Sequence, residues 1–114
     1  MNPATFDNAL TVPLGHPTPK AGAIEGTPME ASVTLFEDDR TEAGVWECTP
    51  GSWTSSKDGI GELMHFVAGS GVITDSDGTR HEFRPGSVQY YPDGWSGTWT
   101  VIETVRKIYV ITRA

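Results

Sequence analysis

Short β-prone runs separated by glycine, aspartate and proline make up the chain from Ala31 onward. Apolar and polar residues alternate along these runs, and no stretch of about eleven residues keeps the 3.6-residue apolar period of an amphipathic helix. The pattern therefore predicts almost no helix and eight short strands, at 32–37, 44–49, 62–69, 71–78, 79–83, 87–92, 97–103 and 105–112. Turns are expected at 75–78, 84–86 and 92–94. Closely spaced strands of this kind are typical of an all-β sandwich or barrel.

Residues 1–30 differ from the rest of the chain. They hold five of its eight prolines, and proline lacks a backbone N–H and fixes φ, so neither a long helix nor a central strand is expected there. We therefore divide the chain into a proline-rich N-terminal arm, residues 1–30, and a single domain, residues 31–114. The arm is expected to drape over the domain or over a partner subunit.

Alternation along each strand predicts which side chains share a face, because successive side chains point in opposite directions. Within 62–67 the even-numbered residues, starting with Glu62, oppose the odd-numbered ones, which include His65. In the last strand Lys107 and Tyr109 share one face. In the same way Trp46 shares a face with Cys48, which we interpret as a small packing residue.

Length and charge exclude several classes of protein. The 114 residues suffice for one domain, and their formal net charge of −7 argues against nucleic acid as a main partner. No apolar run approaches the roughly 20 residues that span a bilayer, and the N-terminus lacks the features of a secretory signal, so no membrane partner is expected. The single cysteine, Cys48, cannot form an internal disulfide, which favours a cytoplasmic setting.

Two glycine-containing spacings resemble the motifs of cupins. Glu62 followed after six residues by Gly69 is similar to the end of the first motif, and Gly86 followed by Pro92 and Gly94 is similar to the start of the second. More narrowly, residues 44–112 resemble a small single-domain cupin family that is named after ureidoglycine aminohydrolase and includes the ethanolamine-utilisation cupin. The residues that carry this resemblance are Trp46, Glu47, Gly69, Gly86, Pro92, Gly94, Trp99, Lys107 and Tyr109.

The resemblance implies an all-β fold, the cupin double-stranded β-helix, which is a jelly-roll barrel. It also implies that the chain forms a homodimer. One fold hosts many chemistries, so the fold by itself does not give the activity.

The metal site of cupins uses three histidines and one glutamate, and the resemblance places them in this sequence. The histidine pair would fall in the polar loop expected at 55–58, which reads Ser-Ser-Lys-Asp, and the third histidine would fall at 95–97, which reads Trp-Ser-Gly. Only Glu62 is left, and one carboxylate does not hold a transition metal. We therefore predict no metal and no cofactor.

Glu62 itself has two interpretations, a pocket carboxylate or a structural acid with satisfied hydrogen bonds. The resemblance favours the pocket, because the equivalent glutamate in the family points into the barrel. His65 also has two interpretations. Strict alternation places it opposite Glu62, in the sheet packing or at a subunit interface, whereas a bulge at Gly61 or Met64 would turn it toward the pocket.

Aromatic residues are numerous on the expected barrel, and such a lining suits an apolar or flat small molecule. Core or dimer packing is the alternative for each of them. Trp53 and Trp95 stand next to expected loops and are candidates for the mouth of a pocket. The candidate ligand-binding residues are Trp46, Trp53, His65, Tyr91, Trp95, Trp99 and Tyr109.

Lys107 needs a counter-charge if its face is the barrel interior, because an unpaired buried ammonium is costly. Glu62 or Glu47 could supply it. Such a pair would either hold a carboxylate-bearing substrate or lock two strands together. Burial also shifts the pKa of a lysine readily, so Schiff-base or general-base chemistry stays open.

Two functions are consistent with the sequence. The first is a metal-independent small-molecule-binding cupin of unassigned ligand, accessory to a metabolic pathway. The second is an enzyme that acts on a small carboxylate- or amine-bearing metabolite and resembles ureidoglycine aminohydrolase, with Glu62 as acid and base and Lys107 orienting the substrate carboxylate. The missing metal histidines favour the first.

Overall fold

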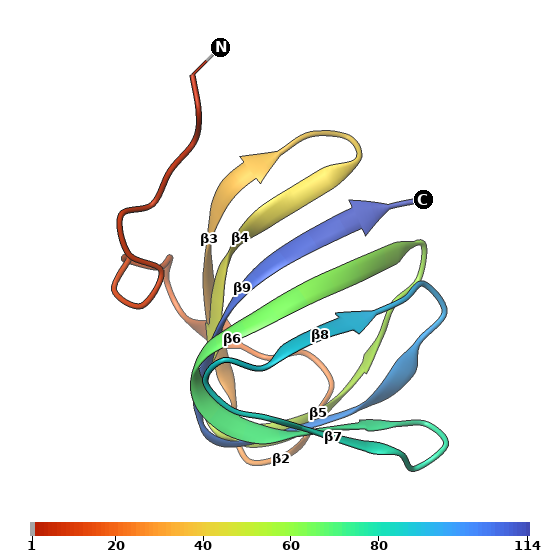
Figure 1. The fold of residues 1–114 in the computed structure, drawn as a ribbon. Helices are drawn as coiled ribbons and strands as arrows, with labels where there is room; N and C mark the ends of the chain where they lie inside the picture. Colours follow the sequence, from red (N-terminus) through yellow and green to blue (C-terminus); the bar gives the residue numbers. More distant parts are fainter. Residues whose placement is uncertain (1) are drawn as a thin grey trace.

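The computed structural model describes residues 2–114, which form nine strands and no helix (Figure 1). The strands are β1 (Thr18–Pro19), β2 (Ala23–Glu25), β3 (Met29–Glu37), β4 (Thr41–Cys48), β5 (Gly51–Ser56), β6 (Ile60–Asp75), β7 (Arg80–Phe83), β8 (Val88–Tyr91) and β9 (Ser96–Arg113). The all-β prediction is confirmed. Nothing in residues 2–114 forms a helix long and apolar enough to cross a membrane.

Strands β6 and β9 are the longest, and they pair with each other in antiparallel fashion along most of their length. The first half of β6 also pairs with β8, and its second half pairs with β7. In the same way β9 pairs with β5 through its first half and with β4 through its second half. The two long strands therefore carry one continuous sheet that curls into a cup (Figure 1).

The curl is made by a shared bend in β6 and β9. Their register shifts three times between Phe66 and Gly71, as expected for β-bulges. Gly69 lies in this bend with φ of +88°, and a Cβ there would collide with the carbonyl oxygen of Thr104. The sequence predicts two strands here, 62–69 and 71–78, and the structure shows the single bent strand β6. In the same way the predicted strands 97–103 and 105–112 are one strand, β9.

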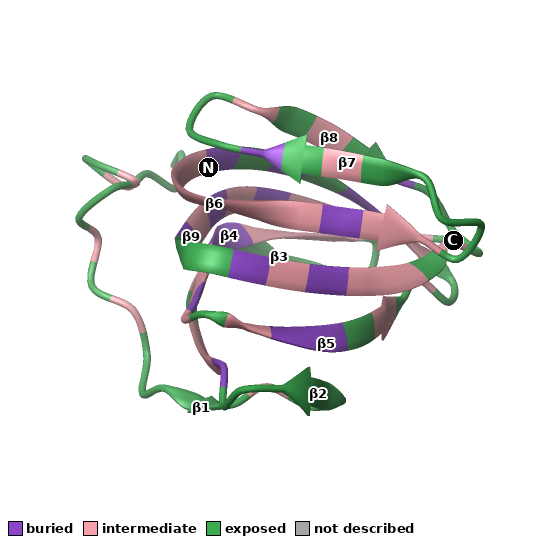
Figure 2. Cartoon of the chain, turned by 90° about the horizontal axis from the view of Figure 1, so that it is seen from below, coloured by how far each residue is buried: buried purple, intermediate pink, exposed green. Residues whose placement is uncertain are grey.

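The core fills the space between the two halves of the curled sheet. Phe66 and Phe83 stack with their ring centroids 4.5 Å apart, and Trp53 stacks on Trp99 at 5.4 Å. The buried hydrophobic cluster contains Cys48, Trp53, Met64, Phe66, Ile73, Phe83, Tyr91, Trp99, Val101 and Val105. Figure 2 shows the buried and less buried residues alternating along the strands, as the period of two requires.

This alternation confirms the predicted faces. Glu62, Met64 and Phe66 are buried, whereas Leu63 and His65 are exposed on the outer face of β6.

The expected polar loop at 55–58 is wrong in its first half, because Ser55 and Ser56 end strand β5. This strand pairs with β9, with Trp53 opposite Trp99. Its serines and threonines give little local strand signal, so pairing with β9, and not local propensity, determines its conformation.

The proline-rich leader contributes two short strands at the ends of the sheet. The strand order is β1-β3-β4-β9-β5-β2, so β1 and β2 lie on opposite edges. Hydrogen bonds also hold earlier residues of the leader to strands β9 and β3. Arg106 donates hydrogen bonds to the carbonyl oxygens of Ala9 and Val12, and the Gly15 N–H donates to the Ser32 carbonyl.

Candidate functional site

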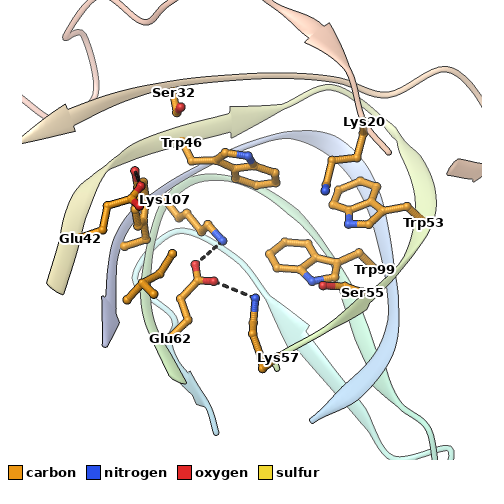
Figure 3. Close-up of a pocket in the computed structure, with 12 residues that line it drawn as sticks. Lys20, Ser32, Glu42, Trp46, Trp53, Ser55, Lys57, Glu62, Trp99 and Lys107 are labelled. Carbon is orange, nitrogen blue, oxygen red and sulfur yellow. Dashed lines mark hydrogen bonds and ion pairs between the residues drawn. The ribbon is translucent and has the colours of Figure 1, made fainter. Parts of the chain in front are cut away.

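A cavity of about 220 Å³ opens inside the cup (Figure 3). Three tryptophans, three lysines and two glutamates dominate its walls. The lining residues are Lys20, Ser32, Glu42, Trp46, Trp53, Ser55, Lys57, Glu62, Trp99, Lys107, Tyr109 and Ile111.

Glu62 lies on the wall of this cavity and is only 4% exposed. Its Oε1 accepts a hydrogen bond of 2.8 Å from Lys57 Nζ, and its Oε2 accepts one of 2.6 Å from Lys107 Nζ (Figure 3). Burial alone would raise the pKa of this carboxyl, but the two ammonium groups outweigh burial and hold the pKa below its ordinary value of 4.5. Glu62 is therefore a carboxylate at neutral pH.

Lys107 occupies the interior of the cup, at 6% exposure. Its Nζ lies 4.5 Å from the ring centroid of Trp46 and 4.9 Å from that of Trp99, in cation–π geometry. Burial lowers the pKa of this amine, and the neighbouring Glu62 opposes that shift. The predicted counter-charge is thus Glu62; the other candidate, Glu47, accepts a hydrogen bond of 3.1 Å from Arg106 instead.

Glu42, the second acid of the lining, already has partners. It accepts a hydrogen bond of 2.9 Å from the Tyr109 hydroxyl and one of 3.1 Å from Arg113 Nη2. Burial and this carboxylate raise the pKa of Tyr109 above its ordinary value, so the phenol stays protonated and donates. Glu42 is thus held by Tyr109 and Arg113, although Arg113 also pairs with Glu37 at 3.2 Å.

Every lysine of the chain lines this one cavity, although the protein as a whole carries a net charge of −7. Two of them, Lys20 and Lys57, were not predicted as site residues from the sequence. Lys57 lies in the segment 55–58, where the cupin resemblance places a histidine pair that this chain lacks, and Lys20 lies in the leader. The chain has only three lysines, and Lys57 lies five residues before the motif residue Glu62. This scarcity of lysine and this spacing are the signals that could have indicated a role for Lys57.

The donor set does not fit a transition metal. Among residues 2–114, no three histidine, cysteine, aspartate or glutamate side chains gather closely enough to hold an ion. Both oxygens of Glu62 are engaged by ammonium groups, which would repel a cation. One of these groups belongs to Lys57, which lies in the segment where the cupin resemblance places the histidine pair.

The structure brings six of the predicted site residues together around the cavity: Trp46, Trp53, Glu62, Trp99, Lys107 and Tyr109. The rings of Trp46 and Trp99 meet edge to face at 5.6 Å. Trp53 is only 1% exposed and stacks on Trp99, so it forms the cavity wall and not the mouth that its position in the sequence indicated.

Tyr91 and Trp95 lie apart from this cavity, near the hairpin between β6 and β7. Their rings are 4.7 Å apart, and the Trp95 indole N–H donates a hydrogen bond of 2.8 Å to Asp75. His81 Nε2 lies 2.9 Å from the other oxygen of Asp75. Hydrogen bonds from His81 and Trp95 lower the pKa of Asp75, which the sequence pattern places in a simple hairpin turn.

His65 does not line the cavity either. The pairing of β6 with β9 is regular from Ile60 to Phe66, without the bulge that would turn this side chain inward. Cys48 is fully buried in the core, and burial raises the pKa of its thiol to about 11, which suits packing and not nucleophilic chemistry.

Comparison with known proteins identifies the family and supports the fold. The family model of the EutQ-like cupin domain matches residues 35–109. A solved structure of unknown function from Pseudomonas syringae pv. tomato is similar with a TM-score of 0.78 and 29% identity, covering 92% of this chain and 46% of that one. The present chain therefore spans about half the length of that protein. No curated protein matches the chain.

Two EutQ structures share the fold at lower identity. EutQ from Clostridium difficile has a TM-score of 0.67 and 21% identity, over 76% of this chain and 70% of that one. A putative ethanolamine utilization protein Q from Salmonella typhimurium has a TM-score of 0.67 and 19% identity, over 85% of this chain and 78% of that one. The predicted cupin fold is confirmed, and the narrower likeness to ureidoglycine aminohydrolase stays a prediction.

Proposed function

The chain belongs to the EutQ-like cupin family, and on this premise we propose that its cavity binds a small carboxylate-bearing metabolite without a metal ion. The observation that carries the proposal is the Glu62 carboxylate held between the ammonium groups of Lys57 and Lys107 inside a tryptophan-lined cup.

The two lysines leave a positive charge that Glu62 cannot balance. Two ammonium groups face one carboxylate, at 2.8 Å and 2.6 Å, and Glu62 has no third oxygen to offer. A carboxylate of a ligand would supply the missing counter-charge and accept the remaining N–H groups in charge-assisted hydrogen bonds. Such bonds are strong in an interior where few waters compete.

The tryptophans supply the apolar part of the site. Trp46, Trp53 and Trp99 all contribute to the walls, with neighbouring rings in contact at 5.4 to 6.1 Å. Aromatic walls with a few convergent polar groups are typical of small-molecule sites. A short hydrocarbon chain next to the charged group of the ligand would be buried against these rings.

The binder would serve a metabolic pathway as an accessory protein. The Salmonella typhimurium protein of similar fold is named a putative ethanolamine utilization protein, which is a metabolic role of that protein. We further place this chain in the cytoplasm, because its one cysteine is unpaired and buried, as is usual in a reducing compartment.

Tryptophan fluorescence tests the proposal, since three tryptophans form the cavity. Titration with butyrate should give a saturable change that butyramide, the uncharged analogue, does not give. Lys57→Met and Lys107→Met should each weaken butyrate binding about tenfold, the loss of one charge-assisted hydrogen bond. Arg84→Met, which removes an exposed positive charge outside this cavity, is the matched control. Equal responses to butyrate and butyramide would refute the proposal.

Catalysis on such a metabolite is the second candidate, favoured by the buried amine of Lys107, which donates a hydrogen bond of 2.6 Å to Glu62 and whose pKa is lowered by burial. A pair of this kind can pass a proton to and from a substrate. Release of ammonia from ureidoglycine, abolished in Glu62→Gln, would support it. No release by the wild-type protein would contradict this candidate.

A further inference from the structure

A segment of the leader passes beside the mouth of the cavity. Residues 18–25, here called the strap, pair with β3 at one end and with β5 at the other, through Thr18 opposite Glu30 and Ala23 opposite Trp53. Because β3 and β5 stand near opposite ends of the strand order, the strap joins two edges of the curled sheet (Figure 2). Its two short strands are exposed along their length.

Lys20 is the residue of the strap that reaches the cavity (Figure 3). Its side chain is only 22% exposed, and its Nζ lies 5.6 Å from the ring centroid of Trp53. The nearest acid, Glu30, is 3.9 Å away, at the limit of an ion pair, and Glu30 also accepts a hydrogen bond of 2.9 Å from Trp46 Nε1. A partly exposed pair of this length contributes little.

The cavity therefore has two separate positive charges that lack a close partner of their own. Glu62 balances one of the two lysines that it contacts, which leaves one charge there. Lys20, on the strap, is the other. Lys20 lies beside the ring of Trp53, which stacks on Trp99, whereas the Glu62 carboxylate and its two lysines lie on the other side of Trp99 in Figure 3.

We infer that Lys20 is a ligand-binding residue that determines specificity, and that the ligand is a small dicarboxylate. One carboxylate is held by Lys57 and Lys107, and the other by Lys20. This inference rests on the proposed function, and it adds the second charge of the ligand and the residue that selects it.

A dicarboxylate has a hydrocarbon spacer between its two charges, and this spacer distinguishes it from a compact dianion as a ligand for the cavity. Sulfate or phosphate carries its charges on a single centre, whereas a dicarboxylate can place one carboxylate at each cationic group and bury its spacer against the tryptophan rings. The cavity of about 220 Å³ is smaller than the usual range for drug-sized ligands, which favours a short spacer.

Calorimetry with a matched pair of ligands tests the inference. Succinate and butyrate have the same four-carbon chain and differ in the second carboxylate. The wild-type protein should bind succinate about tenfold more tightly than butyrate. Lys20→Met should remove this preference by weakening succinate binding about tenfold more than butyrate binding. Lys20→Arg, which keeps the charge, should retain much of the preference.

The outcomes separate the dicarboxylate inference from the proposed function. Equal affinity for succinate and butyrate in the wild-type protein, or an unchanged preference in Lys20→Met, would overturn the dicarboxylate inference alone. Sulfate that competes as well as succinate would overturn it too, in favour of a compact anion. Failure of both carboxylates to bind would remove the proposed function on which the inference rests.

Discussion

At the scale of single residues, the site depends on Glu62 and the two lysines that hold it. A carboxylate buried to this extent is stable only when it is paired, and the pairs at 2.8 Å and 2.6 Å supply that condition. The same geometry gives the cup its positive character. A substitution of Glu62 is therefore expected to change both the stability of the fold and the binding of a carboxylate ligand.

The lowered pKa of Glu62 predicts how stability depends on pH. Because the folded value lies below the ordinary 4.5, the carboxylate stabilises the fold fully above 4.5, and this contribution is lost as the pH falls through the folded value. Wild-type protein should therefore lose more free energy of unfolding between about pH 5 and pH 3 than Glu62→Gln, as measured by urea unfolding.

At neutral pH the same variant should be less stable by about 3 kcal/mol, because Lys107 loses its buried partner. Asp39→Asn, at an exposed turn position, is the control and should keep the wild-type pH profile. Parallel pH profiles for wild type and Glu62→Gln would contradict the role given to this carboxylate.

Alternation with a period of two was enough to predict which residues share a face of β6 and of β9. It left both Glu62 and Glu47 open as the partner of Lys107. Alternation could not predict whether an inward-facing residue lies at the cavity or at the other end of the curled sheet. Tyr91 and Trp95 face inward or pack against the core, as expected of pocket residues, but they lie near the β6–β7 hairpin. Lys20 was not found, because the leader has no alternation to interpret.

At the scale of elements, the bend shared by β6 and β9 decides the shape of the cup. From the sequence, the glycines of this region were interpreted as the end of one strand and the start of the next. Glycine is common both in turns and in bulges, and local pattern does not distinguish them. Only the pairing of β6 with β9 through the bend shows that each is one strand.

Gly69→Ala should be more destabilising than Gly78→Ala. Both glycines have positive φ, +88° and +94°, so both variants carry the backbone strain of about 1 kcal/mol or more. Only at Gly69 would the new Cβ also collide with the Thr104 carbonyl, whereas nothing lies within 4 Å of the position at Gly78. Urea unfolding of the two variants checks the difference. Equal losses would show that close contact in the bend is unimportant.

At the scale of the whole molecule, the outer face of β6 and β8 is apolar and uncovered. Leu63, Val88 and Tyr90 are 43%, 62% and 59% exposed, and Leu63 pairs directly with Tyr90 across the two strands. A net charge of −7 opposes self-association through most other surfaces. We propose that a second copy of the chain covers this face, which gives the homodimer that the cupin resemblance implies.

Sedimentation equilibrium tests this dimer. Wild-type protein should sediment with twice the mass of one chain, and Val88→Glu should sediment as a monomer, because a charge would be buried in the interface. Thr79→Glu, at the exposed β6–β7 turn, adds the same charge elsewhere and should remain dimeric. A monomeric wild-type protein, or a dimeric Val88→Glu, would place the contact on another surface or remove it.

The most direct test of the central claim is the affinity for succinate before and after treatment with a metal chelator, measured by calorimetry. If lysine ammonium groups bind the ligand, the dissociation constant should be the same in both samples and about tenfold larger in Lys57→Met. Binding that disappears on chelation and returns with added zinc or manganese would contradict the account.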